Sequence, residues 1–214
     1  IYPNVLMPYK TELPFTPAIN PTGVYRRSIT IPKRWKDKRV VIYLGGVENC
    51  FYLYCNGKEI GFSKDCRLPT EFDLTPYVHE GENQLSIQVI RFSDSSYIED
   101  QDQWWHAGIH REVRLYATDP VHIKDIFARP GYIPSTQRGH LNVEVSLGDH
   151  NRSSLNHGVR VTLTGPGMKA KSSETTLGKA AFYPVVGKGP KLQFEIPAGK
   201  VKPWSAETPV LYNL

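Results

Sequence analysis

The sequence predicts an all-β protein that consists of two β-sandwich domains in series. Apolar and polar residues alternate in many short segments, which is the pattern of half-buried antiparallel strands. Asn56-Gly57, the pair preferred in a type I′ turn, lies between two of these segments. Helical spacing is confined to one possible turn within LTPYV (74–78). With 214 residues, the chain is long enough for two domains of ordinary size.

Strands follow one another through the first half of the chain. The segment RVVIYLGGV (39–47) is rich in β-branched residues, and CFYLYCNGKEIGFS (50–63) predicts two strands around its turn. The segments LSIQVIRFS (85–93) and REVRLYA (111–117) alternate, whereas RLPTEFDL (67–74) predicts a turn. Leu85, Ile87 and Val89 are expected on one face of the first strand, and Val113 and Leu115 on one face of the second. Those expected to pack under the hairpin from the turn are Leu68, Phe72 and Leu74.

The second half of the chain predicts an immunoglobulin-like sandwich. A boundary is expected within 117–126, where Asp119-Pro120 interrupts the alternation, and 167–182 is expected to be an exposed connection. Short strands separated by Gly, Pro and Ser turns are typical of this fold, and the absence of paired cysteines places it with the fibronectin-like kind. The expected strands are HLNVEVSL (140–147), VRVTLTG (159–165) and KLQFEIP (191–197).

Composition and charge exclude two classes of partner. The hydrophobic fraction of 40% and charged fraction of 22% are those of a soluble globular protein, and no apolar run is long enough to cross a bilayer. The net charge is +5, but the basic residues are dispersed except at 26–27 and within PKRWKDKR (32–39), which is expected to be a loop. No RNA-binding or helix-turn-helix motif surrounds them. We therefore expect no membrane and no nucleic-acid partner.

The cysteines and the first residue bear on compartment and completeness. Cys50 and Cys55 point to opposite faces of one expected strand, so they cannot form a disulfide there. Buried free thiols are expected, which favours a reducing compartment. The chain starts at Ile1 without Met or a leader, and we expect it to be a piece of a longer protein. Its localisation, cytoplasmic or periplasmic, stays open.

The segment SSYIEDQDQWW (95–105) concentrates carboxylates beside tryptophans. If it is extended, Asp100 and Asp102 share a face and Glu99 points away, so both a catalytic pair and a solvated acidic loop are compatible with the spacing. His106 and His110 have the H-x-x-x-H spacing of half a zinc site. They lie between a loop and a strand rather than on a helix, so the sequence predicts no zinc site there.

Three long segments carry a specific resemblance. NPTGVYRRSITIP (20–32), the whole run from CNGKEIGFS to HREVRLYA (55–117) and PWSAETPVLYNL (203–214) closely resemble family 2 glycoside hydrolases of the bacterial β-galactosidase type. The resemblance implies a sugar-binding jelly-roll domain over 1–118, lacking its N-terminal strands, and an immunoglobulin-like domain over 119–214. A catalytic TIM barrel would come next, and it is absent from this chain.

The resemblance also implies a function. The family hydrolyses terminal β-galactosides with retention by means of two barrel glutamates, so this chain would contain no catalytic residue and would be a non-catalytic fragment of a β-galactosidase. The residue matching Asp102 binds galactose and a sodium ion, and the residue matching Asn4 lines the galactose subsite. Sodium and magnesium are implied for the parent enzyme, with neither bound tightly by the fragment. The implied partners are a β-galactoside, the missing barrel and further copies of the parent.

Two points stay open beside this resemblance. The chain could instead be a stand-alone carbohydrate-binding or adhesion module, since β-sandwiches support many functions. Trp104 and Trp105 could stack on the sugar or pack in the core, and packing is expected for at least one of them. The motif WWHAG (104–108) departs from the commonest family form by a second aromatic residue and a histidine, which leaves the shape of the subsite open.

Overall fold

The computed structural model describes residues 9–65, 67–99, 106–149, 157–176 and 190–214. It contains two compact units, Ile1–Asp119 and Pro120–Leu214, and each is described by itself below. Strands make up most of the named elements, and each helical element has only three or four residues, so the predicted all-β class is confirmed. All pairs between named strands are antiparallel. No helix in these residues is long and apolar enough to span a membrane.

Among the described residues, helical structure is limited to three short segments. The expected turn within 74–78 forms the 3₁₀ helix η2 (Thr75–Tyr77). The other two, η1 (Lys33–Trp35) and α1 (Ser95–Ile98), were not predicted. The first lies in the basic run that we expected to be a loop, and the second lies at the start of the acidic segment. Neither could be detected from periodicity, because three or four residues do not complete a repeat.

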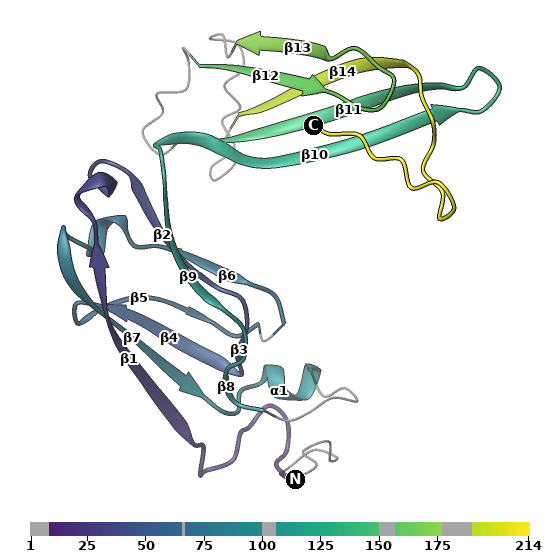
Figure 1. The fold of residues 1–214 in the computed structure, drawn as a ribbon. Coiled ribbons are helices and arrows are strands. Elements are labelled where there is room, and N and C mark those ends of the chain that lie inside the picture. Colours follow the sequence, from purple (N-terminus) through teal and green to yellow (C-terminus); the bar gives the residue numbers. More distant parts are fainter. Residues whose placement is uncertain (1–8, 66, 100–105, 150–156, 177–189) are drawn as a thin grey trace. The chain divides into compact units, whose positions relative to one another are not determined.

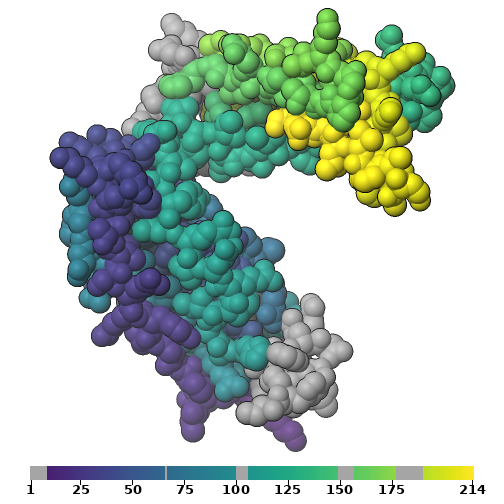
Figure 2. Space-filling view, viewed as in Figure 1, coloured from purple at the N-terminus to yellow at the C-terminus, as the bar shows by residue number. Residues whose placement is uncertain are grey.

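The first unit is built from two principal sheets and one short pair of strands. The four-stranded sheet has the order β1 (Thr22–Ile31), β7 (Gly81–Ile90), β4 (Cys50–Cys55), β5 (Lys58–Ser63). The three-stranded sheet has the order β6 (Thr70–Asp73), β2 (Arg39–Leu44), β9 (Val113–Thr118), and β3 (Val47–Glu48) pairs with β8 (Gly108–Ile109) (Figure 1). Strand β1 forms an edge and is exposed along most of its length (Figure 2).

The core of the first unit lies between these sheets. Leu85, Ile87 and Val89 are all buried in it, which confirms the alternation predicted for β7. On β9 the same prediction was partly wrong, because Leu115 packs against the core but Val113 is 46% exposed. The rings of Phe51 on β4 and Phe72 on β6 meet edge to face with centroids 6.0 Å apart, so the two sheets are packed together. Non-directional burial of apolar surface is the main stabilising contribution here.

Of the two turns predicted in the first unit, one was confirmed and the other was partly wrong. The hairpin between β4 and β5 has Asn56 at φ 51° and Gly57 at φ 78°, as the type I′ prediction requires. The turn predicted over 67–74 was partly wrong, because Thr70–Asp73 pairs with β2 as strand β6. Leu74 is fully buried, but Leu68 is 64% exposed. A four-residue strand with two acidic residues gives too short an alternation to detect.

The second unit contains a three-stranded and a two-stranded sheet (Figure 1). Its three-stranded sheet has the order β10 (Val121–Ile133), β11 (Arg138–Asp149), β14 (Lys191–Lys200), and β12 (Gly158–Leu163) pairs with β13 (Lys171–Thr176). Apolar residues of β11, β12 and β14 form the core. The buried positions include all those predicted on β11: Leu141, Val143, Val145 and Leu147.

Strand β13 corrects the expected exposed connection over 167–182. Lys171–Thr176 pairs along its full length with β12, from Leu163↔Lys171 to Gly158↔Thr176. The strand contains only polar residues and none of them is buried, so hydrophobic alternation could not reveal it. Its position is determined by backbone hydrogen bonds to a neighbour.

Two cysteines are free and buried, as predicted. Cys50 and Cys55 lie at the two ends of β4. Burial raises the pKa of both thiols, which makes them poor nucleophiles at neutral pH. Cys66 lies outside the described residues.

Candidate functional site

Two loop segments of the first unit are held against each other. The Tyr97 hydroxyl on α1 shares its one proton between the backbone oxygens of Thr11 (2.9 Å) and Phe15 (2.7 Å). The Tyr9 ring packs edge to face on Phe92 and Tyr97, with centroid distances of 4.8 and 5.6 Å. The chain around residues 9–15 therefore lies beside α1, as Figure 1 shows.

An asparagine fixes the same two segments just before β1 and after β7. Asn20 donates through Nδ2 to the backbone oxygen of Phe92 at 2.8 Å, and its Oδ1 accepts from the Phe92 N–H at 3.0 Å. The amide side chain thus satisfies both backbone groups of one residue, as a neighbouring strand would. The contact between the two segments is consequently made by polar and aromatic groups together.

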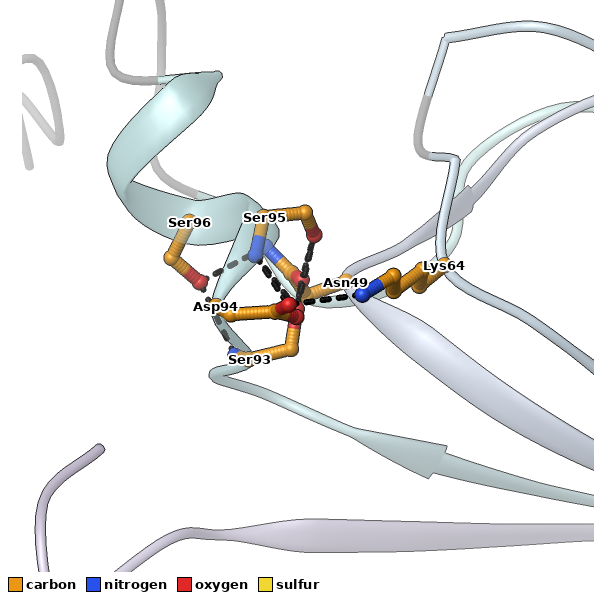
Figure 3. A network of polar contacts seen from close by, with 6 residues as sticks. All are labelled: Asn49, Lys64, Ser93, Asp94, Ser95 and Ser96. Atoms are coloured by element: carbon orange, nitrogen blue, oxygen red, sulfur yellow. Dashed lines mark hydrogen bonds and ion pairs between the residues drawn. The ribbon is translucent and has the colours of Figure 1, made fainter. Parts of the chain in front are cut away.

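A network of side chains around Asn49 holds the start of α1 (Figure 3). Asn49, 2% exposed, accepts through Oδ1 from the Ser93 hydroxyl and from the Ser95 hydroxyl, the latter at 2.7 Å. Its Nδ2 donates to the Ser96 hydroxyl at 2.8 Å, and that oxygen also accepts from the Ser93 N–H at 3.0 Å. One amide therefore joins three hydroxyl groups at the first turn of α1.

The same turn carries an exposed ion pair. Asp94 precedes α1, and its Oδ1 accepts from the Ser95 N–H at 3.1 Å. Lys64 donates from Nζ to the other carboxylate oxygen at 2.6 Å, with both side chains half exposed (Figure 3). This hydrogen bond lowers the pKa of Asp94. The pair adds little stability because water screens it.

The short β3–β8 pair includes β8, the first strand that follows the acidic segment in the chain. Glu48 pairs with Gly108, and Val47 pairs with Ile109. Gly108 has φ +114°, and a Cβ there would come within 2.5 Å of the Tyr25 hydroxyl oxygen. A residue with a side chain would be both strained and crowded at this position, so glycine is required.

A buried carboxylate lies beside this pair of strands. The Glu48 side chain is 6% exposed, and Arg67 donates to it from Nη1 at 3.4 Å. Burial raises the pKa of Glu48, while the charges of Arg67 and His106 oppose the rise and that of Glu99 adds to it. Arg111 donates from Nη1 to the backbone oxygen of Arg67 at 3.1 Å. These charged groups form a cluster that includes Glu99 and His106, the two described residues on either side of 100–105 in the chain.

The histidines of the cluster show no metal-binding arrangement. Burial lowers the pKa of His110, and the neighbouring charges of Arg67 and Arg111 lower it further. In the described part of the chain, no group of three or more His, Cys, Asp or Glu side chains could hold a metal ion.

The residues predicted to bind sugar and sodium lie outside the described residues. Asn4 is within 1–8, and Asp102 is within 100–105, together with Asp100, Trp104 and Trp105. Glu99 is described, and its N–H donates to the Ser95 oxygen at the end of α1. What the structure does show is that the chain following Asn4 contacts the chain preceding Asp102.

Sequence reasoning missed the residues that hold this region. Glu48 and Asn49 are a polar pair between the apolar runs of β2 and β4, and that interruption was the available signal. The hydroxyl-rich run at 93–96 was a second one. Neither pattern identifies its partner, because the contacts join residues far apart in sequence.

We expect the Glu48→Gln variant to change the pH dependence of stability. The raised pKa means that the folded state binds the proton more tightly than the unfolded state, so wild-type stability falls as pH rises from the usual value near 4.5. The glutamine variant lacks this loss. Its melting temperature relative to wild type should therefore be higher at pH 7 than at pH 4, as measured by thermal unfolding.

A matched variant separates burial from charge. Glu112 is 57% exposed and pairs with Arg114, so Glu112→Gln removes one carboxylate that is not buried. Equal pH slopes for wild type and Glu48→Gln would contradict the assigned cost of burying Glu48.

Comparisons with known proteins give consistent results. The family model described as "Glycosyl hydrolases family 2, sugar binding domain" matches residues 1–119, and that described as "Glycosyl hydrolases family 2" matches 121–214. A β-galactosidase of Psychromonas ingrahamii is 37% identical and one of Vibrio cholerae is 38% identical, each over 100% of this chain. The chain spans 21% of the length of each of these relatives.

A solved structure supports the fold. A β-glucuronidase of Bifidobacterium dentium superposes with a TM-score of 0.70 at 21% identity, covering 88% of this chain and 35% of that chain. At this identity the likeness concerns the fold alone.

Proposed function

We propose that the chain, which belongs to family 2 of the glycosyl hydrolases, is a non-catalytic part of a β-galactosidase. The observation that carries this proposal is the identity to named β-galactosidases along the full length of the chain. The chain spans about a fifth of those relatives, so the activity is proposed for the parent protein rather than for these residues.

The proposed reaction is hydrolysis of terminal β-galactosides with retention of configuration. Such enzymes use one carboxyl group as acid and base and a second as nucleophile, with the two groups about 5 Å apart. We assign neither to this chain, and place both in a barrel of the same polypeptide. The chain then contributes sugar-binding side chains and a rigid support for them. Further copies of the parent would complete the assembly.

We assign Asn4 and Asp102 to the galactose subsite. A carboxylate accepts strongly from sugar hydroxyls, and an amide can both donate and accept. Support comes from the contacts of Tyr9, Thr11 and Phe15 with Phe92 and Tyr97, which hold together the segments next to the two residues. Binding residues are often presented from loops by a β framework in this way.

Metal binding is part of the same proposal. Asp102 would provide one carboxylate ligand to a sodium ion, and hard cations require several oxygen ligands. In this proposal the other ligands come from the barrel. We assign no magnesium ligand to this chain.

We expect the 214-residue chain alone to show no glycosidase activity, because acid and nucleophile must be held together on one scaffold. Purified chain is assayed with a nitrophenyl β-galactoside. The parent protein, assayed in parallel, should hydrolyse it.

Two results would contradict the proposal in different ways. Turnover that tracks the concentration of the isolated chain and disappears in Asp102→Ala would place catalysis in this chain. A parent protein that binds β-galactosides without hydrolysing them would instead favour the carbohydrate-binding module.

A further inference from the structure

Two consecutive residues contact both ends of the stretch 93–108, which contains the acidic segment. The Asn49 side chain binds the serines at its start, where α1 begins (Figure 3). The backbone of Glu48 pairs with Gly108 at its end. The stretch from β3 to the first residue of β4 therefore determines where the chain enters and leaves residues 99–107.

The chemistry of the network requires an amide at position 49. Oδ1 accepts two hydroxyl protons while Nδ2 donates one, and no hydrocarbon or simple carboxylate side chain offers that combination. The hydroxyl groups of Ser95 and Ser96 are 8% and 1% exposed as residues, so water does not readily replace the amide. A buried network in which each member has its partners rigidifies the segment that it joins.

The backbone adds to the same fixation. The Asn49 N–H donates to the Ile90 oxygen at 3.3 Å, which ties the residue to the end of β7. The amide thus projects from a position held by the principal sheet of the first unit. Displacement of α1 would break several hydrogen bonds at once.

We infer that Asn49 is a positioning residue for the acidic segment (95–105). Its amide holds the first turn of α1 in one arrangement, so that the helix and Glu99, which follows it, have a defined position. This inference rests on the proposed function, which assigns Asp102 to the galactose subsite. Asn49 itself contacts neither sugar nor cation in this scheme.

The test uses the parent protein with Asn49→Ala and a milder variant, Ser96→Ala. Loss of the amide should leave the binding-competent arrangement only partly populated, which raises KM by the inverse of the populated fraction. We expect KM for a nitrophenyl β-galactoside to rise about 10-fold or more while kcat stays within about 3-fold. Ser96→Ala adds no volume, so it provides the measurement even if Asn49→Ala folds poorly.

Hydrogen exchange supplies a readout that does not depend on activity. Amides within 93–99 and 106–110 should exchange at least about 10-fold faster in both variants, because local opening no longer breaks these hydrogen bonds. The rest of the first unit should exchange as in wild type.

A second buried amide offers a matched control. Asn83 is 2% exposed, accepts through Oδ1 from Asn56 Nδ2 at 2.8 Å and donates to the His79 oxygen at 2.7 Å, near the β4–β5 hairpin. Asn83→Ala should lower the melting temperature as much as Asn49→Ala does, yet leave KM and the exchange of 93–99 unchanged.

Asp102→Ala distinguishes a wrong positioning role for Asn49 from a wrong sugar site. If it lowers kcat/KM while Asn49→Ala and Ser96→Ala leave both KM and exchange normal, the positioning role is wrong and the sugar site stands. An unchanged kcat/KM for Asp102→Ala overturns the proposed subsite and the role of Asn49 within it together. A KM that rises equally in Asn83→Ala shows general destabilisation and also overturns the positioning role.

Discussion

The Asp102→Ala variant of the parent protein should have a kcat/KM for β-galactosides about 30- to 900-fold below that of wild type. The loss corresponds to about 2 to 4 kcal/mol of transition-state stabilisation. A charge-assisted hydrogen bond to a sugar hydroxyl is lost, and so is one ligand of the proposed sodium ion. Steady-state kinetics at fixed sodium measures the effect.

The control for this experiment is an exposed carboxylate of the same unit. The Asp119 side chain is 69% exposed and pairs with Lys38, so Asp119→Ala should change kcat/KM by less than about 2-fold. A normal kcat/KM for Asp102→Ala would show that the acidic segment is a solvated loop.

Asn4 should act together with Asp102. Asn4→Ala should cost less than Asp102→Ala, because a neutral hydrogen bond is weaker than a charge-assisted one. The double variant should lose less than the sum of the two, since both residues bind one ligand. Additive losses would mean that the two residues act at independent places.

The second large effect concerns stability. Leu53 on β4 is fully buried in the core of the first unit, so Leu53→Ala should lower the free energy of unfolding by about 3 to 5 kcal/mol through lost burial and a residual cavity. Hydrogen exchange of the β4 and β7 amides measures the loss in this unit specifically.

A surface leucine gives the comparison. Leu211 is 70% exposed, and Leu211→Ala should change stability by no more than about 0.5 kcal/mol. A loss below about 1 kcal/mol for Leu53→Ala would contradict a close-packed core at β4.

Local patterns predicted the elements that depend on local chemistry. Asn56-Gly57 determines its own turn, because both residues adopt positive φ at little cost. The alternation of Leu85, Ile87 and Val89 corresponds directly to the buried face of β7. In both cases the signal and the structure it predicts lie within the same few residues.

Elements held by distant partners could not be predicted. Strand β13 has no apolar face, and β3 and β8 are two residues long, so pairing with another segment is what defines them. The helix α1 begins with two serines, which have modest helix propensity, and Asn49 stabilises its first turn from 47 positions away.

The candidate site shows the same division. The acidic segment and its tryptophans were conspicuous in the sequence because their charges and rings are crowded together. Its supports, Glu48 and Asn49, were not, since one buried carboxylate or amide has meaning only beside its partners. A polar pair between two apolar strands is therefore a useful signal of a buried network.

A crystal structure of the parent protein with a non-hydrolysable β-galactoside tests the central claim most directly. We expect an Asp102 carboxylate oxygen within about 3 Å of a galactose hydroxyl, with the Asn4 amide at the same sugar. The two catalytic carboxylates should come from residues beyond this chain. A sugar bound with neither Asn4 nor Asp102 in contact would contradict the account.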